Sequence, residues 1–125
     1  MYERNVLLER LRSLLEALER IPRRFADVKT PADFYASDAG VDRMDAICMI
    51  LIAAGEELKI LDRKTDGKLL RRHPGVSWRG AMAVRDVLAH AYFQVNAEQL
   101  FDICANDIPA MIVALKAMIA DVETS

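Results

Sequence analysis

The chain has 125 residues, of which 53% are hydrophobic and 29% are charged, and its formal net charge is −2. These values are typical of a folded chain and exclude intrinsic disorder, and the length predicts one domain over residues 1–125. Only five glycines and four prolines interrupt the sequence, so long segments rich in helix formers favour an all-α fold.

The first residues and the two cysteines predict a cytoplasmic protein. Residues 1–5 are charged and lead directly into an amphipathic pattern, so we expect no signal peptide. We also expect no apolar run long enough to span a bilayer. Cys48 and Cys104 lie in apolar sequence, which predicts small core residues of a reducing compartment rather than a disulfide or a metal-binding pair.

The first predicted helix covers residues 2–21. Its apolar residues alternate three and four positions apart and form a narrow seam of Leu7, Leu11, Leu14, Leu18 and Ile21. Such a seam usually packs inside a bundle, and it could equally contribute to a dimer. Pro22 cannot continue the hydrogen-bond ladder, so the helix is predicted to end or kink there, before an irregular segment over residues 23–35.

The second predicted helix covers residues 37–63, with Ser37 or Asp38 as its cap. Its centre, residues 47–54, is apolar on all sides and is expected to lie deep in the bundle. Gly55 follows in mid-helix, where glycine costs about 0.5–1 kcal/mol relative to alanine. We therefore expect a close crossing with another helix at this glycine.

Two further helices complete the predicted fold. After an irregular, basic segment over residues 66–76, Ser77 is expected to cap a third helix that ends within residues 93–96. A fourth helix over residues 97–122 is predicted to be kinked near Pro109. The sum is an antiparallel four-helix up-and-down bundle with a kinked last helix and one longer connection before the third helix.

The third helix carries four side chains suited to chemistry, namely Arg85, Asp86, His90 and Tyr92. On a regular helix, Asp86 and His90 share one face, while Arg85 and Tyr92 share a second face. Arg85 and His90, five residues apart, would point about 140° away from each other. Either the helix distorts or ends near His90, or a second copy of the chain completes the site.

Histidine and arginine suit a metal-independent reaction on a phosphodiester. RNA cleavage of this kind uses the ribose 2′-hydroxyl as nucleophile, and it needs proton transfer near neutral pH and a cation beside the phosphorane. His90 and Arg85 are the candidates for these two tasks. Asp86 could orient the His90 ring, although an ordinary carboxylate on the helix surface is the simpler interpretation. No residue cluster has metal-ligand spacing, so we expect no metal and no cofactor.

Basic residues are concentrated ahead of these candidates. Residues 59–85 contain 8 of the 17 Lys and Arg residues but only 2 of the 19 Asp and Glu residues. A basic segment that leads into the candidate site is what a polyanion such as RNA needs for binding. The alternative, a solvated loop whose charges only aid solubility, explains the number of basic residues equally well.

Three motifs resemble the HepT-like branch of the HEPN superfamily, which are ribonuclease toxins paired with a minimal nucleotidyltransferase antitoxin. Residues 85–92 resemble the family's Arg-x-x-x-x-His-x-Tyr motif. Residues 53–59 resemble its Gly-Glu signature, and residues 74–79 resemble its proline and tryptophan entry to the motif helix. Pro109 in the last helix also fits. The family usually has Asn after the motif arginine, whereas this chain has Asp86.

The resemblance implies a homodimer in which two motif helices meet, so that two Arg85 and two His90 side chains surround one cleft. It implies that Glu56 lies beside the motif helix and pairs with Arg85; a solvated glutamate is the alternative. It also implies that the nucleotidyltransferase attaches AMP to Tyr92 and silences the toxin by placing negative charge beside Arg85. A buried, hydrogen-bonded tyrosine is the alternative.

The implied function is an endoribonuclease toxin that uses Arg85 and His90 at a dimer cleft and is neutralised by AMP transfer to Tyr92. The alternative is a non-catalytic HEPN module that docks a nucleotidyltransferase or binds nucleotides. Exposure of Arg85 and His90 in a shared cleft would favour the first function, whereas burial and mutual pairing would favour the second.

Overall fold

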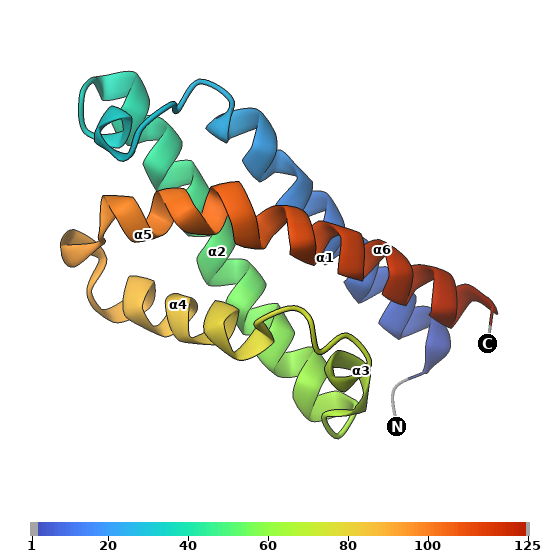
Figure 1. Cartoon of the computed structure of the whole chain (residues 1–125). Helices are drawn as coiled ribbons and strands as arrows, with labels where there is room; N and C mark the ends of the chain where they lie inside the picture. The colour runs from blue at the N-terminus through green and yellow to red at the C-terminus, as the bar shows by residue number, and fades with distance from the viewer. Residues whose placement is uncertain (1–2, 125) are drawn as a thin grey trace.

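The computed structural model describes residues 3–124, which form an all-α bundle without a strand in that range (Figure 1). The long helices are α1 (Arg4–Phe25), α2 (Asp38–Lys64), α4 (Trp78–His90) and α6 (Ile108–Thr124). The short elements are η1 (Pro31–Phe34), α3 (Lys68–Arg71), η2 (Tyr92–Gln94), α5 (Ala97–Asp102) and the π-helical η3 (Ile103–Asp107). The predicted all-α bundle is confirmed.

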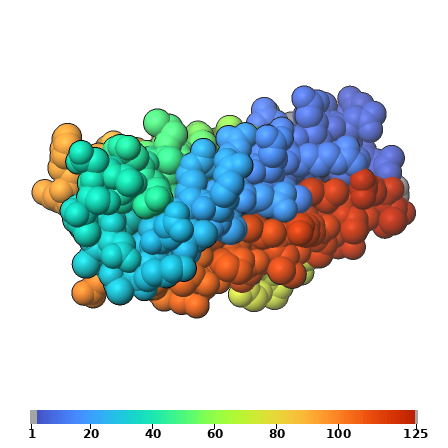
Figure 2. All heavy atoms as spheres, turned by 90° about the horizontal axis from the view of Figure 1, so that it is seen from above, coloured from blue at the N-terminus to red at the C-terminus, as the bar shows by residue number. Residues whose placement is uncertain are grey.

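Successive long helices run in opposite directions, and α5, η3 and α6 together form the last rod of the bundle (Figure 1). Seen from above, α1 and α6 lie side by side (Figure 2). Arg4 Nε donates to the carbonyl oxygen of Val122 at 2.8 Å, which joins the start of α1 to the end of α6. Helix α4 packs mainly on α2, so much of its surface is left uncovered.

Helix α1 buries a stripe of apolar side chains against α2 and α6, formed by Leu8, Leu11, Leu14, Leu18 and Ile21. The predicted seam is therefore confirmed except at Leu7, which is only partly buried. Of the two outcomes predicted at Pro22, an end or a kink, the end is wrong, because α1 passes through Pro22 to Phe25. Pro22 is exposed and lies in the last turn, so one lost hydrogen bond suffices to accommodate it. Tyr2, the predicted start, lies outside the described residues.

Helix α2 begins as predicted, with Ser37 Oγ accepting a hydrogen bond from Gly40 N at 3.0 Å. The expectation that residues 47–54 lie deep on all sides is wrong. Met49 is 66% exposed and Ala53 is also exposed, because α1 and α4 leave the outer strip of α2 uncovered.

Both cysteines are free and buried, as predicted for small core residues. Burial raises the pKa of the Cys48 thiol to about 11, with a smaller contribution from the negative charge of Asp45. Burial likewise raises the pKa of Cys104 to about 12. Both thiols are therefore protonated and unreactive at neutral pH.

Gly55 lies where α2 crosses α4, as expected from its position in mid-helix. A Cβ atom on Gly55 would overlap the Cβ of Arg85, and it would lie 2.9 Å from Arg85 Cγ and 3.1 Å from the carbonyl oxygen of Ala81. Glycine is therefore required here so that α4 can approach α2 closely, and this approach fixes the position of Arg85.

We predict that Gly55→Ala lowers the free energy of unfolding by about 1–3 kcal/mol, because overpacking a close contact forces the backbones apart. Gly75→Ala is the matched control, since a Cβ atom at Gly75 meets no atom within 4 Å. Urea denaturation of both variants measures the difference. An equal stability of the two variants would contradict the tight crossing.

Helix α4 begins at Trp78 as predicted, but the Ser77 side chain makes no capping hydrogen bond. Trp78 is buried instead, and its Nε1 donates to the carbonyl oxygen of His73 at 3.0 Å. The helix ends at His90, earlier than predicted, because Ala91 leaves helical geometry with φ −140° and ψ 45°. The 3-10 turn η2 then follows in place of continued α-helix.

The last rod contains the π-helical turn η3, which ends two residues before Pro109. Proline offers no N–H group to the carbonyl four residues earlier, and a π-helical turn is a common way to absorb this mismatch. This turn is the irregularity that the structure shows near Pro109, and the kink itself stays a prediction.

The expectation that no apolar run could span a bilayer is wrong. The 28 residues of Ala97–Thr124 are long and apolar enough by length and composition. Leu100, Ile108 and Leu115 of this rod are buried in the common core, and α6 packs on α1, but only 39% of the apolar window is buried.

Candidate functional site

Arg85 is held against α2 rather than projecting freely into solvent. Its side chain lies over Gly55, and its Nη2 lies 3.4 Å from Glu56 Oε2. The pairing of Glu56 with Arg85 expected from the sequence is thus present. Nη1 also lies 3.3 Å from Asp86 Oδ1, whereas the buried Nε has no hydrogen-bond partner among residues 3–124. The guanidinium is therefore fixed in position and shared between two carboxylates.

Asp86 turns its carboxylate toward α2 and away from His90. Oδ1 lies 2.6 Å from Lys59 Nζ. The hydrogen bond from Lys59, and after it that from Arg85, holds the pKa of this carboxyl below its usual value. The hypothesis that the Asp86 side chain orients the His90 ring is therefore wrong, because the cations of Lys59 and Arg85 attract this carboxylate instead.

His90 is the last residue of α4, and its ring is exposed. Nδ1 lies 2.8 Å from the backbone carbonyl oxygen of Asp86. A carbonyl oxygen can only accept a hydrogen bond, so Nδ1 carries the hydrogen and the lone pair of the neutral ring is on Nε2. The residue at position 86 thus does orient the ring, through its backbone, and leaves Nε2 available to accept a proton.

Arg85 and His90 do not meet within one chain. No hydrogen bond joins them among the described residues, since Arg85 binds partners on α2 and on its own helix, whereas His90 projects at the end of α4. The helix does end at His90, which was one of the two solutions open from the sequence. This ending does not bring the two side chains together within the described residues.

Tyr92 lies beyond α4 in the turn η2, so the predicted common helix face with Arg85 is wrong. Its hydroxyl donates a hydrogen bond to Asp45 Oδ1 on α2. Burial, followed by the hydrogen bond and negative charge of Asp45, raises the pKa of this phenol. Asp45 is a site residue that sequence reasoning missed, because no spacing pattern connects residues 47 positions apart.

The exposed surface of α4 and η2 includes two large apolar side chains. Val87 is 55% exposed and Phe93 is 100% exposed. Beside them, a groove of about 260 Å³ lies between α4 and the start of the last rod, with Val84, Val95 and Leu100 in its wall. We call Val87, Phe93 and this groove the open face of α4.

The fold and the motif at the end of α4 define a HEPN-like helical bundle. The family model "Ribonuclease HepT-like" matches residues 9–118, and the chain belongs to this family. Membership supports a ribonuclease-type function and confirms the resemblance stated from the sequence.

The chain is also similar to "Putative RNase MJ0127" of Methanocaldococcus jannaschii, with 33% identity over 78 residues. This match covers 62% of the present chain and 61% of the relative. No solved structure matches the chain significantly.

Proposed function

We propose that the protein is the endoribonuclease toxin of a cytoplasmic toxin–antitoxin pair and that it cleaves RNA without a metal ion. The observation that carries this proposal is the position of His90, whose Nε2 is exposed five residues after a fixed arginine in a chain of the HepT-like ribonuclease family. The side chains of residues 3–124 contain no cluster of three His, Cys, Asp or Glu that could hold a metal ion.

The proposed reaction begins when a neutral His90 takes the proton of a ribose 2′-hydroxyl. The 2′-oxygen bonds to the adjacent phosphorus, and the bond from phosphorus to the 5′-oxygen of the next nucleotide breaks. A protonated histidine gives its proton to that leaving oxygen. The products are a 2′,3′-cyclic phosphate and a 5′-hydroxyl. Arg85 stabilises the extra negative charge of the phosphorane, for which the substrate phosphate must replace Glu56.

This reaction needs two histidines, because a base and an acid act in the same turnover. A two-fold dimer through the open face of α4 supplies them and brings Arg85 of one chain toward the His90 of its partner. Val87 and Phe93 are large apolar side chains left in water, which is what an unpaired interface exposes.

We predict that the protein in solution has about twice the chain mass of 14.1 kDa and that Val87→Asp makes it monomeric. An unpaired charge buried in an interface costs several kcal/mol, so the dissociation constant should rise at least about 100-fold. Val113→Asp is the matched control, because it makes the same change at a side chain that is 69% exposed on α6 rather than on α4. Light scattering decides the matter, and a dimeric Val87→Asp would place the interface elsewhere.

The antitoxin is proposed to be a minimal nucleotidyltransferase that transfers AMP from ATP to Tyr92. The hydroxyl oxygen attacks the α-phosphorus, and the bond from that phosphorus to the pyrophosphate oxygen breaks. The phenol proton passes to Asp45, which already accepts its hydrogen bond. The added phosphate and nucleoside would fill the end of α4 beside His90 and exclude RNA.

A second function is favoured by the ion pairs of Arg85. A guanidinium held by Glu56 and Asp86 could serve as scaffold in a non-catalytic module that docks a nucleotidyltransferase or binds nucleotides. Incubation of the purified protein with RNA in EDTA separates the two functions. Fragments that end in 2′,3′-cyclic phosphate support the ribonuclease, whereas intact RNA that still binds supports the module.

A further inference from the structure

A separate pocket of about 550 Å³ lies between the end of α2, the short helix α3 and the start of α4. Its wall includes the apolar side chains of Leu70, Val76 and Met82 and the only tryptophan of the chain, Trp78. Small-molecule sites are typically concave, largely apolar and between about 300 and 1,000 Å³ in volume. The pocket is therefore large enough for a nucleotide, and neither Arg85 nor His90 lines it.

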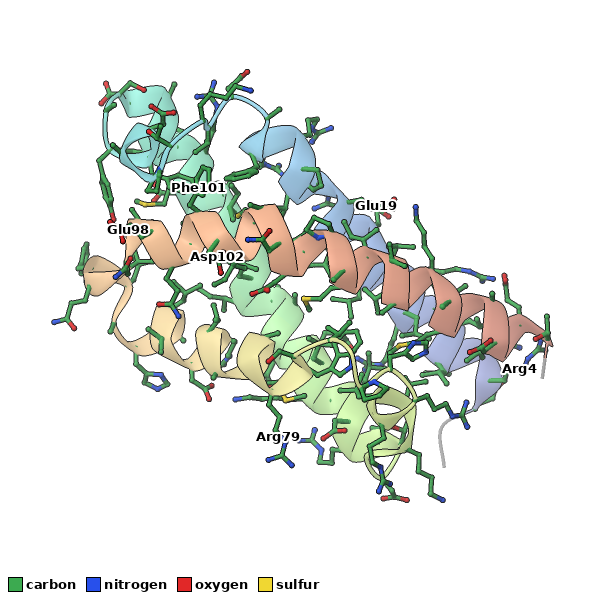
Figure 3. The ribbon with its side chains drawn as sticks, in the orientation of Figure 1. Arg4, Glu19, Arg79, Glu98, Phe101 and Asp102 are labelled. Carbon is green, nitrogen blue, oxygen red and sulfur yellow. The ribbon has the colours of Figure 1, made fainter. Side chains whose placement is uncertain are left out.

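Two arginines line the pocket without an ion pair to any carboxylate among residues 3–124. Arg71 Nε donates to the carbonyl oxygen of Gly67 at 2.9 Å, and Nη2 donates to that of Asp66 at 3.3 Å. These neutral acceptors fix the guanidinium without cancelling its charge. Arg79 is exposed, and it extends from the start of α4 on the side away from the last rod (Figure 3). Such arginines favour a phosphate group.

Two carboxylate residues, Asp62 and Asp66, also line the pocket. A Cβ atom built on Gly67 would lie 3.7 Å from Asp62 Oδ1 and 3.8 Å from Arg71 Nη2, so both groups face this turn. An ionised carboxylate only accepts hydrogen bonds. Guanine presents two adjacent donors, N1–H and the N2 amino group, and it is therefore the base that best matches a carboxylate with two oxygens. A base on the apolar wall would thus have a polar partner at its edge.

The pocket is joined to the proposed active end of the protein by one helix. Arg79 and His90 are at opposite ends of α4, eleven residues or about 16 Å apart along the axis. A single strand of RNA can follow this length with one nucleotide in the pocket and its scissile bond beside His90. The basic segment counted in the sequence borders this path, since Arg71 and Arg79 both belong to it.

We propose that this pocket is an RNA subsite that binds one nucleotide a short distance from the scissile bond, with its phosphate on Arg71 and Arg79 and guanine preferred through Asp62. This inference rests on the proposed ribonuclease function for its substrate. It adds a specificity site that neither the Arg85–His90 motif nor Tyr92 supplies.

Trp78 gives a direct readout, because no other residue of the chain fluoresces when excited at the red edge of the tryptophan band. Titration of the wild-type protein with 5′-GMP is expected to change this emission saturably. AMP, CMP and UMP should each bind about tenfold more weakly. No response to GMP, or an equal response to all four nucleotides, overturns the proposal.

Variants locate the bound nucleotide. Arg79→Ala is expected to weaken GMP binding about tenfold and to raise KM for RNA by a similar factor with kcat unchanged. Asp62→Asn should remove the preference for GMP over AMP. Arg63→Ala is the matched control, since Arg63 is exposed in the same basic segment but lies outside the pocket. Arg79→Ala and Arg63→Ala with the same affinity for GMP would overturn the assignment.

These outcomes separate the subsite from the ribonuclease proposal. If wild-type protein cleaves RNA but GMP leaves Trp78 unaffected, the subsite is wrong and the ribonuclease stands. If GMP binds with the expected preference while RNA stays intact, the nucleotide pocket stands and the catalytic function is wrong.

Discussion

Replacing His90 or Arg85 with alanine is expected to abolish RNA cleavage while the fold survives. Proton transfer by a positioned histidine contributes about 10²–10⁴-fold in rate, and a fixed cation beside developing charge contributes on the order of 10²–10³-fold. His90 is exposed, so its removal costs little packing. Arg85→Ala keeps the Cβ atom that lies over Gly55, so the crossing of α2 and α4 is preserved.

The measurement is single-turnover cleavage of a labelled RNA, with circular dichroism as the test of folding. Arg20→Ala is the control for Arg85, because Arg20 also pairs with a glutamate, Glu16, at 2.9 Å but lies far from α4 in the chain. His73→Gln removes the only other histidine and should leave cleavage unchanged. In cells, expression without the antitoxin should arrest growth, and equal toxicity of His90→Ala would refute the mechanism.

The helices could be predicted because each repeats its apolar residues at helical spacing. The stripes of α1 and α2, the cap at Ser37 and the close crossing at Gly55 all follow from local rules that tertiary packing then reinforces. Where a helix meets the solvent depends on neighbours that are distant in sequence. Met49 was therefore predicted to be buried, because it lies in an apolar stretch of the sequence, but its side chain is exposed in the fold.

The candidate site could be predicted in its residue types but not in its partners. Periodicity places Asp86 one turn from His90, yet the carboxylate binds Lys59, which is 27 residues away on α2. Tyr92 leaves the helix because Ala91 ends it, and it then meets Asp45 across the bundle. In both cases a charge or a hydrogen-bond acceptor on α2 attracts the side chain. The spacing of residues within α4 does not indicate which residues of α2 face it.

Tyr92→Phe is expected to yield a toxin that its antitoxin cannot modify. Phenylalanine keeps the ring and its edge-on contact with Phe93, whose centroid lies 5.9 Å away, but it removes the hydroxyl that we propose as the acceptor of AMP. The variant should fold, dimerise and stay toxic when the nucleotidyltransferase and ATP are present. Intact-protein mass spectrometry should show a gain of one or more AMP units on the wild type and none on Tyr92→Phe.

Asp45→Asn tests how the hydroxyl is activated. Asparagine can still accept a hydrogen bond from Tyr92, but it cannot take up the proton that AMP transfer releases, so modification should slow by about 10²-fold or more. Asp42→Asn, on the same exposed strip of α2 one turn earlier, is the matched control and should be modified at the wild-type rate. The comparison is best made in the His90→Ala background, where RNA cleavage cannot interfere. If the wild-type protein carries no AMP after incubation with its true partner and ATP, Tyr92 is a packing residue. That outcome would favour the non-catalytic module.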